Sequence, residues 1–409
     1  MPALDGMRIL DMTQYEAGTS CTQALAWLGA DVVKVESPNG GDPGRGLLMG
    51  LWEDSEYFVN WNSNKRSVTI DLSKPEGRDL LLRMVPKYDV FIENYGPGVI
   101  EKLNIGYDVM KEIHPGLIYA RIKGFGTSGP YSGYKSFDVV AQAASGAMSI
   151  TGEADGPPMR IGPTIGDVGT GVQMALAVTA AYVQKHNTGQ GQLIEMSMQE
   201  AVTYFMRTMI AMGAKWGTQS AERRGNGSNP SVNLFPCKPG GPNDYVYIMC
   251  VTDKMWQTLC KTIERDDLAN DERLKGHIGR RDHADFIYGE VCKWTRERTK
   301  HEAMQYLSDR GVPSSAVFDT KDLYTDPHLV GRGFVHEVEH EELGTIPLLG
   351  WPARMSESSV PIQGAPILGR HTADVLREDL GLTDDDLKPL LESGAISHGE
   401  PKSREAKAK

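Results

Sequence analysis

The first forty residues alternate between apolar strands and a helix, and this alternation constrains the fold more than any other feature of the chain. A short β-type run at 8–12 is followed by a helical stretch at 21–28 and an apolar strand at 31–36 (DVVKVE). Two strands joined by a helix predict a βαβ unit with parallel strands. The same pattern continues with strand signals at 67–72, 89–94 and 116–123 and a helix at 78–85. The expected fold class is therefore α/β, with a doubly wound parallel sheet.

An N-terminal βαβ unit invites comparison with dinucleotide-binding proteins. In such a protein Glu36, which ends the second strand, would hold a ribose hydroxyl. The fingerprint of these proteins needs three glycines in the first turn, whereas residues 13–18 (TQYEAG) contain only Gly18. We therefore expect the parallel sheet without a nicotinamide cofactor.

Length and composition narrow the class of protein. A chain of 409 residues exceeds one comfortable core, which predicts two domains. The net charge of −11 argues against a nucleic-acid partner, although it leaves room for a local basic pocket. Five scattered cysteines without a CxxC pair fit a reducing cytoplasm and support neither disulfides nor a metal site. No signal peptide and no apolar run near the ~18 residues of a membrane span are visible, so we expect a cytoplasmic protein without a membrane partner.

Asp167 is the strongest candidate for a reactive side chain. It lies among glycines at 162–171 (GPTIGDVGTG), directly before a long and nearly uncharged helical stretch at 168–186. The ordinary interpretation is an N-cap that accepts a backbone N–H bond at the helix terminus. The other interpretation is a nucleophile, because the glycines let a thioester approach and the helix terminus keeps the carboxylate ionised. The position alone leaves both interpretations open.

Composition changes after Met212, which predicts a second domain. A polar, glycine-containing stretch at 223–230 (RRGNGSNP) is typical of a loop or linker. The signals beyond it are a hairpin turn at 238–244, a strand at 245–250, charged amphipathic helices at 255–310, and strands at 314–318 and 334–347 around Gly344. The charged residues at 399–409 predict a disordered tail.

Six short motifs follow one another along nearly the whole chain. They are Ala17 with Gly18, 28–36 (LGADVVKVE), 64–67 (NKRS), 93–98 (ENYGPG), Gly166 with Asp167, and 368–372 (LGRHT). In this order they resemble the class III CoA-transferase family, of the formyl-CoA transferase or CaiB–BaiF type. The resemblance implies a large Rossmann-like CoA-binding domain at 1–200, completed by 330–395, and a smaller α+β domain at 225–325. It also implies two chains interlocked as a dimer.

The resemblance implies an activity as well: transfer of CoA from an acyl-CoA donor to a free carboxylic acid. In the family, the aspartate that matches Asp167 attacks the thioester and later carries CoA as an aspartyl thioester. The donor would be formyl-CoA, succinyl-CoA or a similar thioester, and the acceptor a dicarboxylate or an aromatic succinate-type acid. Coenzyme A is then a thioester substrate, and no permanently bound cofactor is implied. The partner would be a second copy or a related subunit.

The same resemblance implies a set of residues around CoA. The matching positions are Gln14, Glu16, Ala17, Ser37, Ile70, Leu72, Asn94, Tyr95, Gly96, Lys102, Lys135 and Phe137. Ile70 and Leu72 would flank the adenine, and the two lysines suit phosphates as point charges. Lys102 is equally well explained as a solvated surface charge. Formyl-CoA transferases have His in place of Gln14, Gln in place of Glu16 and Arg in place of Ser37.

Two other functions remain as alternatives. Racemases of 2-methylacyl-CoA esters need a His before the Asp of an HD pair, and this chain has Phe137 before Asp138. Phenylalanine cannot accept a proton, which disfavours a racemase. A partner subunit of a heteromeric CoA-transferase would be expected to lose the aspartate, whereas Asp167 is present. The sequence therefore favours an active transferase.

Overall fold

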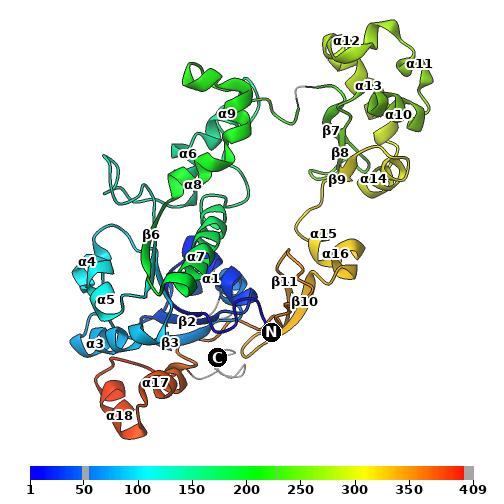
Figure 1. Cartoon of the computed structure of the whole chain (residues 1–409). Helices are drawn as coiled ribbons and strands as arrows, with labels where there is room; N and C mark the ends of the chain where they lie inside the picture. The colour runs from blue at the N-terminus through cyan, green and yellow to red at the C-terminus, as the bar shows by residue number, and fades with distance from the viewer. Residues whose placement is uncertain (48–54, 228, 400–409) are drawn as a thin grey trace. The chain divides into compact units, whose positions relative to one another are not determined.

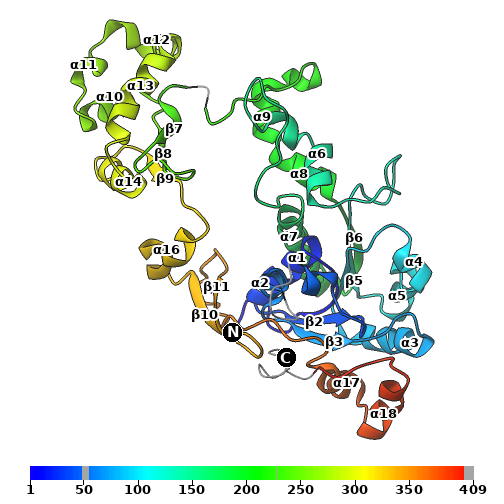
Figure 2. The same cartoon turned by 180° about the vertical axis from the view of Figure 1, so that it is seen from behind.

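The structure, a computed structural model, describes residues 1–47, 55–227 and 229–399 (Figures 1 and 2). All of the predicted tail except Gly399 lies outside these residues. The chain divides into two compact units, which are described separately below. Unit 1 takes in Met1–Met148, Arg160–Thr218 and the chain from Gly333 onwards, and unit 2 takes in Ser149–Met159 and Gln219–Arg332. Unit 2 thus includes the stretch Ser149–Met159, which the predicted small domain at 225–325 does not contain.

A six-stranded parallel sheet forms the centre of unit 1, in the order β3-β2-β1-β4-β5-β6. The strands are β1 (Arg8–Met12), β2 (Asp31–Glu36), β3 (Arg66–Thr69), β4 (Val90–Glu93), β5 (Ile118–Lys123) and β6 (Gln192–Ser197). The predicted α/β class with a parallel sheet is confirmed. The strand order reverses between β1 and β4, and ligands of such sheets bind at the carboxyl ends of the strands beside this reversal.

Helices cover both faces of this sheet. α1 (Ala17–Trp27) and α7 (Val168–Thr188) pack against each other beside the strands (Figure 1). The opposite face carries α3 (Pro75–Met84), α4 (Val99–Leu103), α5 (Tyr107–Ile113), α17 (Thr372–Leu380) and α18 (Asp384–Glu392). The remaining helices of unit 1 are α2 (Glu56–Asn62), α6 (Asp138–Ala144), α8 (Met198–Phe205) and α9 (Arg207–Gly213). In the part of the chain that the structure describes, no helix combines the length and apolarity of a membrane span.

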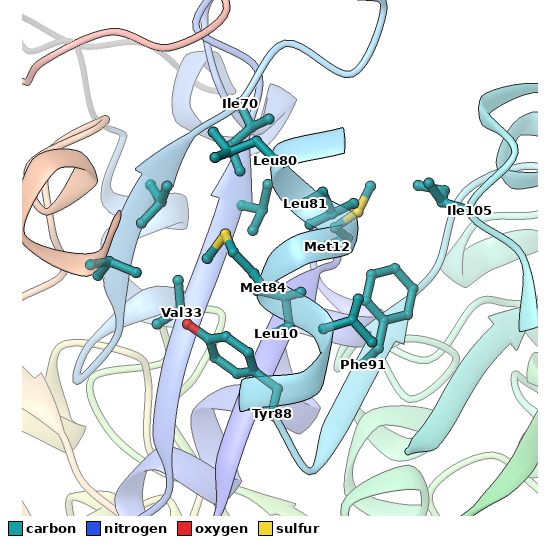
Figure 3. Close-up of a cluster of buried hydrophobic side chains, with 14 of the residues drawn as sticks. Leu10, Met12, Val33, Ile70, Leu80, Leu81, Met84, Tyr88, Phe91 and Ile105 are labelled. Atoms are coloured by element: carbon teal, nitrogen blue, oxygen red, sulfur yellow. The ribbon is translucent and has the colours of Figure 1, made fainter. Parts of the chain in front are cut away.

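The apolar core of unit 1 lies between the sheet and α3 (Figure 3). Leu10 and Met12 point to this face because alternate residues of a strand share a side. They meet Leu80, Leu81 and Met84 of α3, all at most 2% exposed. Full burial of one such side chain contributes about 1.5–3 kcal/mol, so this cluster is a main source of the unit's stability.

The last part of the chain returns to unit 1. A hairpin of β10 (Val335–His340) and β11 (Gly344–Leu349) confirms the strands predicted around Gly344. Beyond it, α17 packs on α3 and β3, as both views show (Figures 1 and 2). The buried Asp379 of α17 accepts hydrogen bonds from Arg8 Nη2 at 2.7 Å and from the Tyr88 hydroxyl at 2.6 Å. The two ends of the sequence are therefore joined within one unit.

Unit 2 has a small core of its own. β7 (Val232–Pro236), β8 (Tyr245–Met249) and β9 (Ser314–Ala316) form an antiparallel sheet, which confirms the hairpin predicted at 238–244. Phe235, Trp256 and Leu259 are among the buried residues of this core. The longer helices are α10 (Asp253–Thr262), α12 (Gly276–Asp282), α13 (Ala284–Thr295) and α14 (Lys300–Ser308), and the shorter ones α11 (Asp266–Ala269), α15 (Asp322–Thr325) and α16 (Pro327–Gly331).

Candidate active site

Three carboxyl groups gather around the loop that leads into α7, all within unit 1. Glu16, at the start of α1, accepts hydrogen bonds from the Thr164 hydroxyl and from the Tyr57 hydroxyl, the second at 3.3 Å. Asp138, the first residue of α6, accepts a bond from the backbone N–H of Gly166 at 2.8 Å. The loop is thus tied to one carboxyl group on each side. We call Glu16, Asp138 and Asp167 the carboxyl cluster.

Glycines in and after this loop permit close packing. A Cβ at Gly166 would lie 2.6 Å from the backbone oxygen of Asp138, and one at Gly171 would lie 2.0 Å from Ser20 Oγ and 2.6 Å from the Ala17 oxygen. Both contacts are far too short, so neither position accepts a side chain without movement. The glycine at 171 brings α7 onto α1, and the glycine at 166 brings the loop onto α6. These two glycines are explained by packing within the protein, besides any approach of a ligand.

Asp167 occupies the N-cap position of α7, but its side chain accepts no capping hydrogen bond. The hydrogen bond that the N-cap interpretation requires is therefore not formed. A capping residue normally has an extended backbone that turns its side chain toward the first N–H groups. Asp167 instead has φ −89° and ψ −70°, which is a helical conformation. Its half-buried carboxyl group is consequently left available for another role.

The carboxyl cluster favours protonation of its central member. Burial, together with the charges of Glu16 and Asp138, raises the pKa of Asp167 to about 8. Burial also raises the pKa of Glu16, against the opposing effect of the hydrogen bonds from Thr164 and Tyr57. Burial and like charges thus oppose the ionisation of Asp167 that the helix terminus was expected to favour.

A cavity of about 180 Å³ opens at the carboxyl ends of β1, β4 and β5, beside the reversal in strand order. Its backbone walls are linked by hydrogen bonds: Gln14 N donates to Asn94 Oδ1 and Asn94 Nδ2 donates to Gln14 O, both at 2.8 Å. Gln14 Nε2 also donates to the Tyr95 hydroxyl at 2.9 Å. The lining residues are Gln14, Tyr15, Asn94, Tyr95, Gly96, Pro97, Ile122, Lys123, Gly124, Tyr134, Lys135, Ser136, Phe137 and Met198.

Buried ion pairs hold the turn between β1 and α1. Lys34 pairs with Asp42 at 2.9 Å and donates to the Thr13 oxygen at 2.7 Å. Asp42 Oδ1 accepts the backbone N–H of Tyr15 at 3.0 Å, and Tyr15 has the left-handed φ of +57°. A non-glycine residue persists in that conformation only where its surroundings determine it. The pair thus sets the positions of Gln14, Tyr15 and Glu16.

Comparison with known proteins agrees with this arrangement. Residues 4–372 match CoA-transferase family III. The chain belongs to this family. It is 38% identical over 409 residues to a formyl-CoA:oxalate CoA-transferase of Streptomyces coelicolor, covering 96% of this chain and 99% of that protein. A formyl-CoA:oxalate CoA-transferase of Rhodopseudomonas palustris is 37% identical over 416 residues, covering 96% and 97%. A CaiB/BaiF family protein of Brucella suis superposes with a TM-score of 0.82 at 30% identity, over 92% of this chain and 99% of the other.

The chain is thus a CoA-transferase, and the structure brings many of its predicted site residues together. Six of them line the cavity: Gln14, Asn94, Tyr95, Gly96, Lys135 and Phe137. Glu16 and Asp167 belong to the carboxyl cluster, and Ala17 is buried beneath Gly171. The cavity and the carboxyl cluster are adjacent, because Gln14 and Glu16 lie in the same turn between β1 and α1.

Other predicted site residues of this transferase lie elsewhere. Ile70 is 1% exposed inside the core and Leu72 packs on the same cluster, so Ile70 has no side-chain surface to offer adenine. Ser37 is exposed and its hydroxyl accepts the backbone N–H of Asn39 at 3.2 Å. Lys102 is exposed on α4. Glu36, the residue considered above for a ribose hydroxyl, is buried and pairs with Arg45 at 2.8 Å.

The candidate site also contains residues that the sequence does not predict. Tyr15 and Asp138 adjoin predicted residues, while Tyr57 and Thr164 reach Glu16 from distant segments. The positive φ of Tyr15 has no signature in a single sequence. The sequence pointed to Asp138 only as half of an absent His–Asp pair, although its carboxylate holds the Asp167 loop.

Proposed function

We propose that this CoA-transferase moves CoA from an acyl-CoA thioester to a free carboxylic acid through a covalent intermediate on Asp167. The observation that carries the proposal is the carboxyl group of Asp167. It lies in a loop fixed by Glu16 and Asp138 and accepts no capping bond. The names of the relatives support thioester exchange between acids.

The reaction needs four exchanges. The Asp167 carboxylate attacks the donor thioester carbonyl, the C–S bond breaks, and CoA leaves as a thiolate. The thiolate then attacks the Asp167 carbonyl of the mixed anhydride, which releases the donor acid as a carboxylate. The acceptor carboxylate attacks the aspartyl thioester and again releases the thiolate, which finally attacks the acceptor acyl carbon and restores Asp167. Each step exchanges one anion for another, so one thioester replaces another without ATP.

The carboxyl cluster supports this chemistry by making the nucleophile more basic. A carboxylate with a pKa near 8 attacks a carbonyl more readily, once ionised, than one with an ordinary pKa. Glu16 and Asp138 also hold the loop, so the carboxylate is positioned before the thioester arrives. We therefore assign Asp167 as the nucleophile and the other two carboxyl groups as the residues that position and tune it.

The cavity is our proposed binding site for the thioester end of CoA. Gln14, Asn94 and Tyr95 offer polar groups there, and Lys135 offers a positive charge. Lys102, Leu72 and Ser37 remain proposed contacts of the more distant parts of CoA. We propose formyl-CoA, succinyl-CoA or a similar thioester as donor, and a dicarboxylate or an aromatic succinate-type acid as acceptor.

Assembly and location are proposals of the same kind. Helices α7, α8 and α9 expose large apolar side chains, among them Leu176 at 72%, Phe205 at 52% and Met212 at 62%. Exposed apolar surface of this extent supports an interface with another chain. We propose that two copies, or this chain and a related subunit, interlock as a dimer in the cytoplasm.

The test is trapping of the intermediate. We expect hydroxylamine, added after an acyl-CoA, to leave a hydroxamate on the peptide that contains Asp167, measured by mass spectrometry. Asp167→Asn should show no adduct and at least a thousandfold loss of transfer, in the range of about 10³–10⁶ that loss of a nucleophile causes. Asp108→Asn, an exposed aspartate of α5, is the matched control and should behave as wild type.

Two results would contradict the proposal. Substantial transfer by Asp167→Asn would exclude the covalent route. A well-folded wild-type protein that forms no adduct with formyl-, acetyl-, succinyl- or aromatic acyl-CoA would instead indicate a subunit that depends on a partner chain.

A further inference from the structure

A buried arginine joins three of the six sequence motifs. Arg45, between β2 and α2, is 4% exposed. Its Nε and Nη2 donate to the two carboxylate oxygens of Glu36, each at 2.8 Å. Glu36 Oε1 also accepts the Ser67 hydroxyl at 2.7 Å, and Ser67 Oγ accepts the backbone N–H of Gly369 at 2.8 Å. The motifs that contain Glu36, Ser67 and Gly369 therefore meet at this ion pair, to which the proposed function gives no role.

The ion pair also supports the segment that carries Glu16. The backbone N–H of Asp42 donates to Glu36 Oε2 at 3.0 Å, so the carboxylate that Arg45 binds fixes Asp42 as well. Asp42 Oδ1 in turn accepts the backbone N–H of Tyr15 at 3.0 Å. Tyr15 directly precedes Glu16. One support of the carboxyl cluster therefore leads back to Arg45.

Helix α2 is attached to the same arginine. The backbone N–H of Ser55, the N-cap of α2, donates to the Arg45 oxygen at 2.9 Å. The Arg45 guanidinium lies over the ring of Phe58 in α2, 3.7 Å from the ring centroid. Such a contact is stronger in a buried place than at an exposed one. Tyr57 lies between these two attachments and donates to Glu16 Oε2 at 3.3 Å.

The hydroxyl of Tyr57 bears on the ionisation of the carboxyl cluster. The titratable groups that interact with Asp167 are Glu16 at the start of α1, Asp138 of α6 and Tyr57 of α2. Burial raises the pKa of Glu16, and the hydrogen bonds from Thr164 and Tyr57 oppose this rise. Burial and then the charge of Glu16 raise the pKa of Asp167. A well-placed Tyr57 thus keeps Glu16 ionised, which increases the negative charge beside Asp167.

We propose that Arg45 is a positioning residue for the CoA transfer, because it holds α2 where the Tyr57 hydroxyl reaches Glu16. Through this contact Arg45 maintains the negative charge beside Asp167. The inference rests on the proposed function, since it concerns the residue that would attack the thioester. A planar guanidinium suits the position because it binds a carboxylate through two N–H groups and stacks on an aromatic ring at the same time. A lysine would keep the charge and lose both features.

The first experiment needs no substrate. It measures the free energy of unfolding in urea from pH 5 to 9, with and without Asp167→Asn. The gain from Asp167→Asn grows with pH and levels off above the folded-state pKa of Asp167, about 8 in wild type. We expect Arg45→Lys and Tyr57→Phe each to make the gain level off at a pH lower by about 0.5, because Glu16 is then less ionised. Beside Tyr57→Phe, Arg45→Lys should add no further shift.

Two more variants separate the contacts of the arginine. Phe58→Leu removes the ring under the guanidinium and keeps the ion pair with Glu36, so we expect a shift of the same sign even if Arg45→Lys does not fold. Arg66→Lys is the matched control. The Arg66 guanidinium also binds one carboxylate through two nitrogens, with Nε 3.0 Å and Nη2 2.6 Å from Asp31. It lies at the amino end of β3, whereas the cavity lies at the carboxyl ends of the strands, so its curve should coincide with that of wild type.

The second experiment measures kcat for the exchange of labelled succinate into succinyl-CoA. We expect Arg45→Lys to lower kcat by about tenfold to a hundredfold, as a small displacement of a reactive group does. Arg66→Lys should stay within about twofold of wild type, because its ion pair supports no part of the carboxyl cluster. An equal loss in the two arginine variants would show general structural damage and overturn the positioning role.

Two results of the unfolding measurement would also overturn the inference. One is a gain that levels off at the wild-type pH in both Arg45→Lys and Phe58→Leu. The other is a shift by Arg45→Lys that persists undiminished beside Tyr57→Phe, because Arg45 would then act by another route. Failure of the proposed function is distinct: no adduct forms on Asp167 with any acyl-CoA, whatever the unfolding curves show.

Discussion

Asp167 carries a proton near neutral pH because burial and two neighbouring carboxyl groups oppose its charge. Its pKa is about 8 in the folded chain, against an ordinary value of 3.8. The folded state therefore binds more protons than the unfolded state between these pH values. Because proton binding and folding are coupled, the free energy of unfolding falls as pH rises from about 4 to about 8. The loss of stability is complete above about pH 8. A residue suited to attack a thioester is thus one that weakens the fold.

Removing this charge should stabilise the protein. We expect Asp167→Asn to raise the free energy of unfolding by about 1–2 kcal/mol at pH 8.5, after allowance for solvent screening. The gain should shrink toward pH 5, where wild-type Asp167 is neutral. Urea unfolding at pH 5, 7 and 8.5 measures it. A difference between the two proteins that does not change with pH would contradict the assignment.

The same charge coupling predicts the pH dependence of the reaction. The value of kcat/KM for acyl-CoA should rise with pH and level off above about pH 8, because the free enzyme must first ionise Asp167. Glu16→Gln keeps hydrogen-bonding groups for Thr164 and Tyr57 but removes one negative charge. We expect its rising limb to move to lower pH.

Glu112→Gln, at an exposed position of α5, is the control for that shift. Its profile over pH 6–9 should coincide with that of wild type. Coincidence of the Glu16→Gln profile with wild type would show that Glu16 does not set the ionisation that limits the reaction.

At the scale of elements, the contact of α1 with α7 depends on Gly171. Alanine there would place a Cβ against Ser20 Oγ and the Ala17 oxygen, so Gly171→Ala should cost about 1–3 kcal/mol through overpacking. A Cβ at Gly289 in α13 would meet no atom within 4 Å, and Gly289→Ala should gain about 0.5–1 kcal/mol. Urea unfolding of both variants measures whether the free energy of unfolding changes in opposite directions, as expected. A gain in both would show that α1 and α7 are loosely packed.

The helices and strands also show how much of the secondary structure the local sequence pattern can predict. β1 and β2 have the predicted bounds because each is a short run in which buried apolar residues predominate or alternate with a few charged ones. α1 begins at Ala17, four residues before the expected start at 21, because small and polar residues such as Thr19 and Ser20 are buried in its first turn. β6 was not predicted, since this half-buried strand lies at the edge of the sheet beside β5, and its mixed residues lack a clear alternation.

The candidate site likewise contains residues that the sequence predicted and a group of residues that only the tertiary fold brings together. Asn94 and Tyr95 were predicted from the family resemblance, and both directly follow β4. The carboxyl cluster was not predicted as a group, because Glu16, Asp138 and Asp167 are far apart in sequence and meet only through the tertiary fold. The pKa of Asp167 follows from that meeting, and therefore a single sequence could not reveal it.

At the scale of the whole molecule, unit 1 is completed by residues from both ends of the chain. Asp379 joins Arg8 and Tyr88, and Asp379→Ala would remove the buried acceptor that both share, leaving Arg8 its more exposed pair with Asp31. We expect a loss of about 2–4 kcal/mol in the free energy of unfolding. Asp384→Ala breaks an exposed pair with Arg377 and should change it by less than about 1 kcal/mol. Thermal unfolding of both variants decides, and equal losses would contradict the anchoring role of Asp379.

The late return of α17 and α18 has a consequence for the order of events on the ribosome. Val375, Leu376 and Leu387 cover the sheet face that contains Ile70 and Tyr88. During translation, the residues of unit 2 emerge before these three are made. The apolar face of the N-terminal sheet therefore stays exposed until α17 and α18 are synthesised. Nascent chains that end before α17 should be the ones that chaperones retain and that aggregate when released.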